Sequence, residues 1–176
     1  MEVELISIGS ELTSGKVINT NASFMTRILE IHGIKTLRIT TIGDEKDSII
    51  RALKNCLPEV KAVIVTGGLG PTPDDITRTA VSQSFGRKLV ENLEATNAMN
   101  KLYRKWGLKP EEIDVVLNYF PQGATLIPNP IGVFGFYLEY QGKLYFFIPG
   151  VPEEMKLMIK EKIIPILKRR MTSKVI

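Results

Sequence analysis

The segment from Gly67 to Thr77, GGLGPTPDDIT, holds the residues of this sequence that are best suited to chemistry. Its glycines follow a short apolar run, where glycine lets the backbone approach a ligand closely and adopt positive φ angles. The amides of such a loop can point at an anion, and a helix that begins near Asp75 would add its N-terminal dipole. The segment therefore predicts a phosphate-binding loop. The predicted contacts are Gly67, Gly68, Leu69, Gly70, Thr72 and Thr77.

Two adjacent acids in this loop, Asp74 and Asp75, indicate that a phosphate would arrive together with a cation. Carboxylate and phosphate oxygens share Mg²⁺ readily, so we predict that both aspartates are catalytic and hold a divalent metal. The alternative is that Asp74 caps a helix and Asp75 is a favourable first-turn acid. The loop lacks the Gly-Lys-Ser/Thr of a Walker A sequence and the glycine spacing of a dinucleotide fingerprint.

Polar residues also follow two other apolar runs that are predicted to be strands, Val3–Ile8 and Lys35–Ile42. The first run is followed by a loop that begins at Gly9, and the second is followed by Asp44. Loops at the carboxyl ends of parallel strands gather at one edge of a sheet, where ligands bind. We therefore add ligand contacts at Gly9, Ser10, Asn19 and Asn21, and metal ligands at Asp75, Asp44 and Glu11. One of the asparagines could instead cap the first helix, and Asp44 could cap the second.

Two rigid turns near the end of the chain are predicted to form walls of the same site. They contain Asn129 and Gly132 in the first turn, and Pro149 and Gly150 in the second. Proline and glycine also serve simply to end one element and begin the next, so the wall is the more specific of two readings.

The order of predicted elements is strand, helix, strand, helix, strand, which is typical of a parallel sheet with right-handed crossovers. The strands are expected at Val3–Ile8, Lys35–Ile42 and Ala62–Thr66. A helix from Asp75 to Phe85, a polar helix from Leu93 to Trp106 and a helical turn from Glu111 follow. A β-hairpin of Gly135–Tyr140 and Leu144–Ile148 and a helix from Pro152 to Leu167, with Pro165 near its end, close the fold. The first helix is expected between the first two strands, with Met25, Ile28, Leu29 and His32 on one face. The second is expected after Asp44, with Ile49, Ile50, Leu53 and Leu57 on one face, and should stop at Pro58.

The composition limits the classes of protein to which the chain can belong. With 176 residues and 44% apolar content it suits one domain. The single Cys56 and single His32 give neither an internal disulfide nor a zinc cluster. A net charge of +4 without interleaved basic and aromatic residues makes nucleic-acid binding unlikely. No leader pattern or apolar span is present, so we expect a cytoplasmic protein that does not bind a membrane.

Taken in order, these motifs resemble the amino-terminal domain of the CinA (competence/damage-inducible) family. The motifs that carry the resemblance are Gly9-Ser10-Glu11, Gly43-Asp44, Thr66–Thr77, Asn129-Pro130 and Pro149–Met155. The resemblance implies a three-layer α/β/α domain of the molybdopterin-binding type, as in MoaB and Mog proteins, with a mainly parallel sheet and a late β-hairpin. It places a single domain at residues 1–170 and a basic tail at 171–176, without the carboxyl-terminal amidase domain.

The resemblance also implies cleavage of ADP-ribose at its pyrophosphate, with a divalent metal and K⁺, in a homo-oligomer such as a dimer or trimer. The chain departs from the CinA pattern at Ser10, where an Asp is usual, and in Leu117–Phe120 and Val133–Phe136. Three functions stay open: a metal-dependent pyrophosphatase for a small nucleotide-type ligand, a non-catalytic nucleotide-binding module, and a protein that binds or adenylylates molybdopterin.

Overall fold

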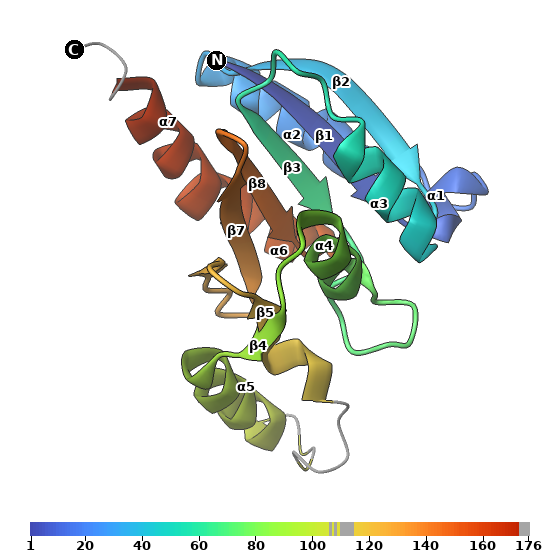
Figure 1. The fold of residues 1–176 in the computed structure, drawn as a ribbon, viewed down its shortest axis with the longest axis vertical. Coiled ribbons are helices and arrows are strands. Elements are labelled where there is room, and N and C mark those ends of the chain that lie inside the picture. Colours follow the sequence, from blue (N-terminus) through green and yellow to red (C-terminus); the bar gives the residue numbers. More distant parts are fainter. Residues whose placement is uncertain (106, 108, 110–114, 173–176) are drawn as a thin grey trace.

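A six-stranded sheet forms the centre of the computed structural model, which describes residues 1–172 except 106, 108 and 110–114 (Figure 1). Its strands are β1 (Glu2–Ile8), β2 (Lys35–Ile42), β3 (Ala62–Thr66), β6 (Thr125–Ile127), β7 (Gly135–Tyr140) and β8 (Lys143–Ile148). Their order in the sheet is β2-β1-β3-β8-β7-β6. Strands β2, β1, β3 and β8 run parallel, whereas β7 is antiparallel to β8 and β6 is antiparallel to β7.

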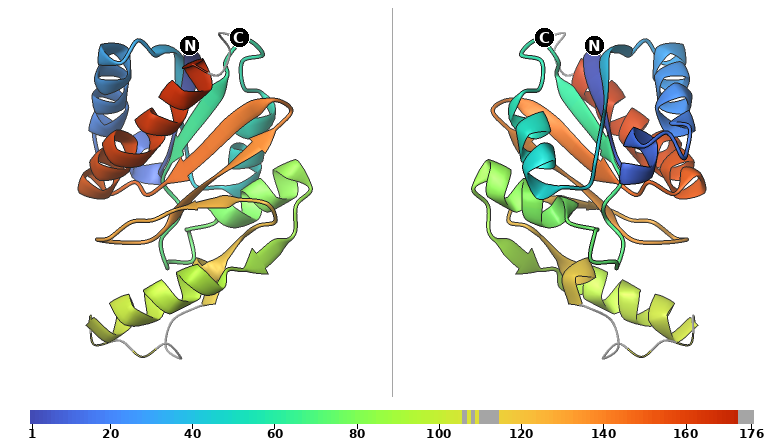
Figure 2. Two further views of the ribbon diagram at one scale, coloured as in Figure 1. Left: turned by 90° about the vertical axis from the view of Figure 1, so that its left-hand side faces the viewer. Right: turned by 90° about the vertical axis from the view of Figure 1, so that its right-hand side faces the viewer.

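Helices cover both faces of this sheet and complete three layers (Figures 1 and 2). One face carries α2 (Thr20–Ile31), α6 (Pro152–Met158), the π-helical turn η3 (Ile159–Ile163) and α7 (Ile164–Thr172). The other face carries α3 (Lys46–Lys54) and α4 (Thr77–Phe85). A short helix, α1 (Ser10–Thr13), follows β1. The predicted three-layer α/β/α architecture with a mainly parallel sheet is confirmed.

The segment between α4 and β6 forms a separate projection. It contains β4 (Leu89–Glu91), α5 (Leu93–Lys105), the 3-10 turn η2 (Val115–Asn118) and β5 (Tyr119–Pro121). Strands β4 and β5 pair as a two-stranded antiparallel sheet. Figure 2 shows α5 at the end of the molecule opposite the N-terminus. Strands β4, β5 and β6 were not predicted from the sequence, and the helical turn predicted from Glu111 lies outside the described residues.

The predicted strands and hairpin are confirmed, but several predicted helix ends are wrong. Helix α3 begins after Glu45, with no side-chain cap, rather than after Asp44. It ends at Lys54, before the predicted stop at Pro58. The final helix, which was predicted to end near Leu167 just after Pro165, continues to Thr172. Proline lacks the N–H that donates the hydrogen bond within an α-helix. The wider π-helical turn η3 ends two residues before Pro165, and its different hydrogen-bond pattern can accommodate the missing donor.

No helix in the described part of the chain combines the length and the apolar composition that a membrane crossing requires.

An ion pair between a fully buried glutamate and a partly exposed arginine joins β1, β2 and the segment after α3. Glu4 is fully buried, and its carboxylate accepts hydrogen bonds from Arg38 Nε at 2.8 Å and from the Leu57 N–H at 2.9 Å. We expect Glu4→Ala to lower the free energy of unfolding by about 2 kcal/mol, because it leaves the Leu57 amide without its acceptor and Arg38 without its partner. Urea unfolding monitored by circular dichroism would measure this change.

The control is Glu139→Ala, which removes the exposed pair between Glu139 and Arg170. Exposed ion pairs contribute little, so this variant is expected to unfold at nearly the same urea concentration as the parent protein. Equal losses in the two variants would contradict the role of burial.

Candidate functional site

A cavity of about 640 Å³ opens at the carboxyl ends of β1, β3 and β8. Thirteen of the residues predicted from the sequence line it: Gly9, Glu11, Asp44, Gly67, Gly68, Leu69, Gly70, Thr72, Asp74, Asp75, Gly132, Pro149 and Gly150. The structure therefore brings the glycine loop, the acids and both rigid turns together. The remaining predicted residues, Ser10, Asn19, Asn21, Thr77 and Asn129, do not line this cavity.

The first two glycines of the loop have backbone conformations and surroundings that exclude a side chain. Gly67 has φ +103°, and a Cβ there would lie 2.2 Å from the carbonyl oxygen of Ile8. Gly68 has φ +68°, and a Cβ there would lie 2.2 Å from Thr77 Oγ1. The Gly67 N–H donates to the Ile148 carbonyl at 3.0 Å, which ties the loop to the end of β8. Glycine is therefore required here for close packing of the loop between β1 and β8.

Two buried side chains support the loop from behind. Thr77 is fully buried and its hydroxyl donates to the Gly67 carbonyl at 3.0 Å. Thr77 was predicted to contact the phosphate, but its side chain does not line the cavity. Arg78 is also fully buried; its Nη1 donates to the Leu69 carbonyl at 2.8 Å and its guanidinium lies 5.2 Å from the centre of the Phe120 ring. Arg78 was not predicted as a site residue, because nothing in its spacing distinguishes it from an exposed helical arginine.

The carboxylate of Asp75 closes the turn of the loop. It accepts hydrogen bonds from the Thr72 N–H at 2.9 Å and from the Thr72 hydroxyl at 2.7 Å. Helix α4 begins only after Ile76, so the alternative in which Asp74 caps the helix is wrong. Asp74 is exposed and lines the cavity. Asp75 thus stabilises the turn, and its Oδ2 atom already accepts both hydrogen bonds from Thr72.

Asp44 is held by the loop that follows β1. The Ser10 hydroxyl donates to the Asp44 carboxylate, which explains why this aspartate does not cap α3. Glu11 is exposed, follows Ser10 directly in α1 and also lines the cavity. Ser10 therefore orients a neighbouring acid and does not line the cavity itself.

The two asparagines of the first connection support the site from outside it. Asn19 caps α2 by accepting from the Ala22 N–H at 3.1 Å, as the capping alternative predicted, and it donates to Thr41 Oγ1 at 3.2 Å. Asn21 donates to the Gly150 carbonyl at 2.7 Å, which connects α2 to the turn before α6. Both residues hold loops in place rather than lining the cavity.

Glu154 lines the cavity but was not predicted as a site residue, although it belongs to the Pro149–Met155 motif. Asn129 is buried, and its Nδ2 donates to Glu154 Oε2 at 2.6 Å and to the Val133 carbonyl at 3.0 Å. A Cβ at Gly132 would lie 2.2 Å from the same carboxylate. Burial raises the pKa of Glu154, and the hydrogen bonds from Asn129 and Val133 partly oppose that change. Asn129 and Glu154 are 25 residues apart in sequence, so local spacing could not reveal this pair.

The raised pKa of Glu154 makes stability depend on pH in a predictable direction. A folded protein that holds its proton more tightly than the unfolded chain loses stability as pH rises through the interval between the two pKa values. We expect Glu154→Gln, which keeps an acceptor for Asn129, to remove this loss, so that its stability relative to the parent protein increases from pH 4 to pH 7. Thermal unfolding across this range would measure the difference, and a constant difference would contradict the assignment.

The cavity is acidic. Five carboxylates line it, namely Glu11, Asp44, Asp74, Asp75 and Glu154, and no lysine or arginine is among its lining residues. Within the described part of the chain, no three His, Cys, Asp or Glu side chains lie close enough to form a metal site from protein groups alone. The donor set nevertheless suits a Mg²⁺ ion that takes one or two carboxylates and completes its shell with phosphate oxygens and water.

Known proteins with similar sequences and folds show the family to which the chain belongs. A family described as a probable molybdopterin binding domain matches residues 4–169. The crystal structure of the protein CinA from Thermoplasma acidophilum superposes with a TM-score of 0.83 at 32% identity, covering 93% of this chain and 97% of that one. The chain belongs to the CinA-like group of molybdopterin-binding domains. The predicted family is thus confirmed.

Longer proteins also contain this CinA-like domain. A CinA-like protein from Geotalea uraniireducens is 41% identical over 173 residues, which cover 97% of this chain and 41% of the relative. A protein from Pyrobaculum aerophilum is 40% identical over 169 residues, covering 94% of this chain and 63% of the relative. The chain therefore spans between two fifths and two thirds of the length of these curated relatives. MoaB from Thermus thermophilus shares the fold, with a TM-score of 0.64 at 18% identity over 94% of this chain and 91% of that one.

Proposed function

We propose that this CinA-like domain is a metal-dependent pyrophosphatase that cleaves nucleotide sugars of the ADP-ribose type. The observation that carries the proposal is the pairing of a glycine loop with five carboxylates in a cavity whose lining contains no basic side chain. A diphosphate would be repelled by such a lining unless cations came with it. The site therefore favours a metal–diphosphate complex over a free anion.

The residues divide between holding the metal and holding the diphosphate. Asp74, Asp75 and Asp44, with Glu11, would share Mg²⁺ with the ligand, and K⁺ could add to the charge balance. Bound Mg²⁺ would supply Lewis acidity at the phosphoryl oxygens. Amides of the segment from Gly68 to Gly70 would donate to those oxygens as negative charge develops on them, because the Gly67 and Thr72 amides already donate to Ile148 and Asp75. Ser10 keeps Asp44 oriented, and Thr77 and Arg78 keep the loop in its shape.

The reaction is hydrolysis of a phosphoanhydride. A water oxygen bonds to one phosphorus atom while the bond from that phosphorus to the bridging oxygen breaks, so that ADP-ribose and water give AMP and ribose 5-phosphate. A carboxylate beside the loop would orient the water and accept its proton, and the exposed side chain of Asp74, which lines the cavity, is our candidate for that role.

The test is chromatography of ADP-ribose incubated with the purified protein, with Mg²⁺ and K⁺ present or removed by chelation and dialysis. Metal-dependent release of AMP is the expected result. Calorimetric binding of ADP-ribose without AMP release would replace hydrolysis with a non-catalytic nucleotide-binding role. Absence of both binding and release would reject the proposal.

Molybdopterin binding is the second candidate, and the family match over residues 4–169 favours it. The fold shared with MoaB from Thermus thermophilus is compatible with the same ligand class. Fluorescence of a pterin retained by the purified protein, or acquired on incubation with molybdopterin, would support this function. A protein that gains no pterin fluorescence would exclude it.

A further inference from the structure

Glu154 is the one carboxylate of the acidic cavity that the proposed metal chemistry does not use. The other four, Glu11, Asp44, Asp74 and Asp75, follow β1, β2 and β3, whereas Glu154 follows β8 and lies in the first turn of α6. In the sheet order β2-β1-β3-β8 it therefore lies at the opposite end of the cavity from Asp44. Adjacent strands are about 4.8 Å apart, so the ends of β2 and β8 are separated by about 14 Å.

Neither a protein cation nor a cluster of acids occupies the Glu154 carboxylate. The described residues that line the cavity include no lysine or arginine that could pair with it. In the part of the chain that the structure describes, no three His, Cys, Asp or Glu side chains are close enough to hold a metal ion, so Glu154 is not grouped with two other acids. Its oxygens are therefore acceptors for which a ligand must supply the donors.

The Glu154 carboxylate is oriented before any ligand binds. Asn129 Nδ2 donates to Oε2 at 2.6 Å, and the Val133 N–H donates to the same carboxylate. Both oxygens lie against Gly132, where an added Cβ would be 2.2 Å from Oε2 and 2.6 Å from Oε1. Fixed polar groups of this kind determine how a ligand is oriented in a pocket.

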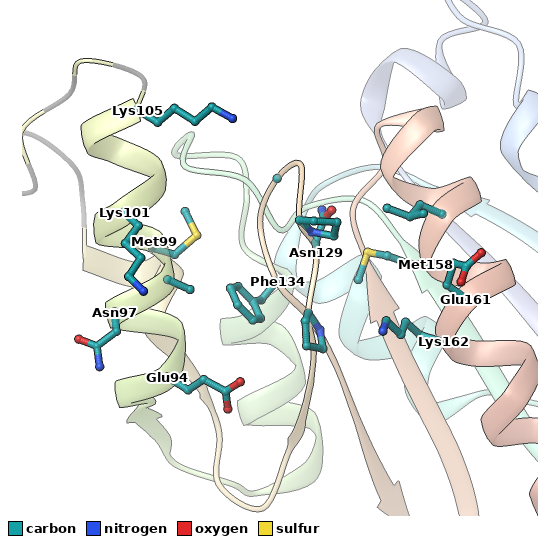
Figure 3. A pocket seen from close by; sticks show the side chains of 15 residues that line it. Glu94, Asn97, Met99, Lys101, Lys105, Asn129, Phe134, Met158, Glu161 and Lys162 are labelled. Carbon is teal, nitrogen blue, oxygen red and sulfur yellow. The ribbon is translucent and has the colours of Figure 1, made fainter.

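The segment that holds Glu154 has a cavity on each side. Residues 131–133 line the acidic cavity, whereas Asn129, Pro130 and Gly132 line a larger cavity of about 1010 Å³ between α5 and α6 (Figure 3). The hydrogen bonds from this segment to Glu154 therefore fix the position of the carboxylate relative to one wall of the acidic cavity.

Aliphatic side chains flank Glu154. Ile131 and Val133 lie on either side of Gly132 in sequence, and Val151 comes directly before α6; all three line the acidic cavity. A phosphate group placed here would be repelled by the carboxylate and would gain nothing from the aliphatic groups. The organic part of a diphosphate ligand therefore fits this end of the cavity better than its phosphates do.

We propose that Glu154 is a specificity-determining residue that accepts hydrogen bonds from two neighbouring hydroxyl groups of a sugar attached to the diphosphate. This inference rests on the proposed function for the placement of the diphosphate beside the glycine loop. The two oxygens of one carboxylate can accept from two adjacent hydroxyl groups at once, and such bonds are charge-assisted. The contact makes the domain prefer diphosphates that carry a hydroxylated sugar.

The test is calorimetric binding of magnesium ADP and of magnesium 2′,3′-dideoxy-ADP, which differ only in two sugar hydroxyls. ADP has a single sugar, which can lie beside Glu154 in either orientation of the diphosphate. The parent protein should bind ADP at least about tenfold more tightly, because at least one charge-assisted hydrogen bond is lost in the dideoxy compound. Magnesium pyrophosphate, which has no sugar, measures the phosphate position alone.

Glu154→Gln is the main variant, because it keeps an oxygen acceptor for Asn129 and removes the charge. The preference for ADP should fall below about threefold, since neutral hydrogen bonds contribute less than charge-assisted ones. Glu154→Ala should abolish the preference, and Glu154→Gln alone carries the test if that variant does not fold. Magnesium pyrophosphate should bind Glu154→Gln at least as well as the parent protein, because one repelling charge is gone.

The matched control is Glu153→Gln, since Glu153 is the preceding residue, is exposed and does not line the cavity. It should keep the full preference for ADP. A purely structural role of Glu154 predicts a different result: Glu154→Gln would weaken both nucleotides equally and leave their ratio unchanged, which would overturn the inference. A parent protein that binds the two nucleotides equally, or binds neither, would overturn it as well.

Failure of this inference is distinguishable from failure of the pyrophosphatase. A preference for ADP that Glu154→Gln removes, in a protein that releases no AMP from ADP-ribose, would keep the sugar contact and reject hydrolysis. Metal-dependent AMP release by a protein that binds ADP and dideoxy-ADP equally would keep hydrolysis and reject the sugar contact.

Discussion

Asp75→Asn is expected to lower metal-dependent release of AMP from ADP-ribose by about a hundredfold to a thousandfold, the range seen when one preorganised electrostatic group is lost from an active site. The substitution preserves shape, because the asparagine side-chain oxygen can still accept from the Thr72 N–H and hydroxyl as the carboxylate does. What it removes is the negative charge that would attract Mg²⁺. Initial rates measured over a series of Mg²⁺ concentrations should show both a lower maximum and a higher half-saturating concentration.

Asp75→Ala separates the charge of this residue from its task in the turn. It loses both contacts to Thr72, so we expect an additional loss of thermal stability that Asp75→Asn does not show. Asp47→Asn is the matched control. Asp47 is an exposed aspartate in the first turn of α3, so it also lies near a helix start, but it does not line the cavity. Unchanged turnover in Asp75→Asn would remove Asp75 from the mechanism while leaving the other acids in place.

The strands and the edge where the site forms could be predicted because they depend on local signals. Each apolar run that ends in glycine, such as Ala62–Thr66 before Gly67, became a strand followed by a cavity-lining loop. The alternation of strands and helices then required the carboxyl ends of β1 and β3 to lie together. The strands and the sheet edge that carries the site could therefore be predicted from the hydrophobic pattern and the order of the elements.

The roles of individual polar side chains could not be predicted, because they depend on partners that are distant in sequence. Asp44 has the sequence context of a helix cap, yet its carboxylate is taken by Ser10, 34 residues earlier. Glu154 depends in the same way on Asn129. Arg78 supports the loop only because Phe120 and the Leu69 carbonyl are adjacent to it in the fold.

Gly67→Ala is expected to destabilise the domain by about 3 kcal/mol and to abolish binding of magnesium pyrophosphate, because steric strain at a functional loop and backbone displacement add together. Two independent features cause the effect. Gly67 has φ +103°, which disfavours any side chain, and the added Cβ would lie 2.2 Å from the Ile8 carbonyl oxygen. Because that oxygen belongs to the end of β1, relief of the clash must move either the strand or the loop.

Gly86→Ala provides the control that separates these two causes. Gly86 ends α4 with φ +62°, but a Cβ there would meet nothing within 4 Å. Alanine at this position should therefore cost only the left-handed backbone conformation, about 1 kcal/mol, and should leave pyrophosphate binding intact. Urea unfolding and calorimetry of both variants measure the comparison. If Gly67→Ala were no worse than Gly86→Ala, the close approach of the loop to β1 would not determine the shape of the site, and the proposal that the amides from Gly68 to Gly70 bind phosphate would lose its structural basis.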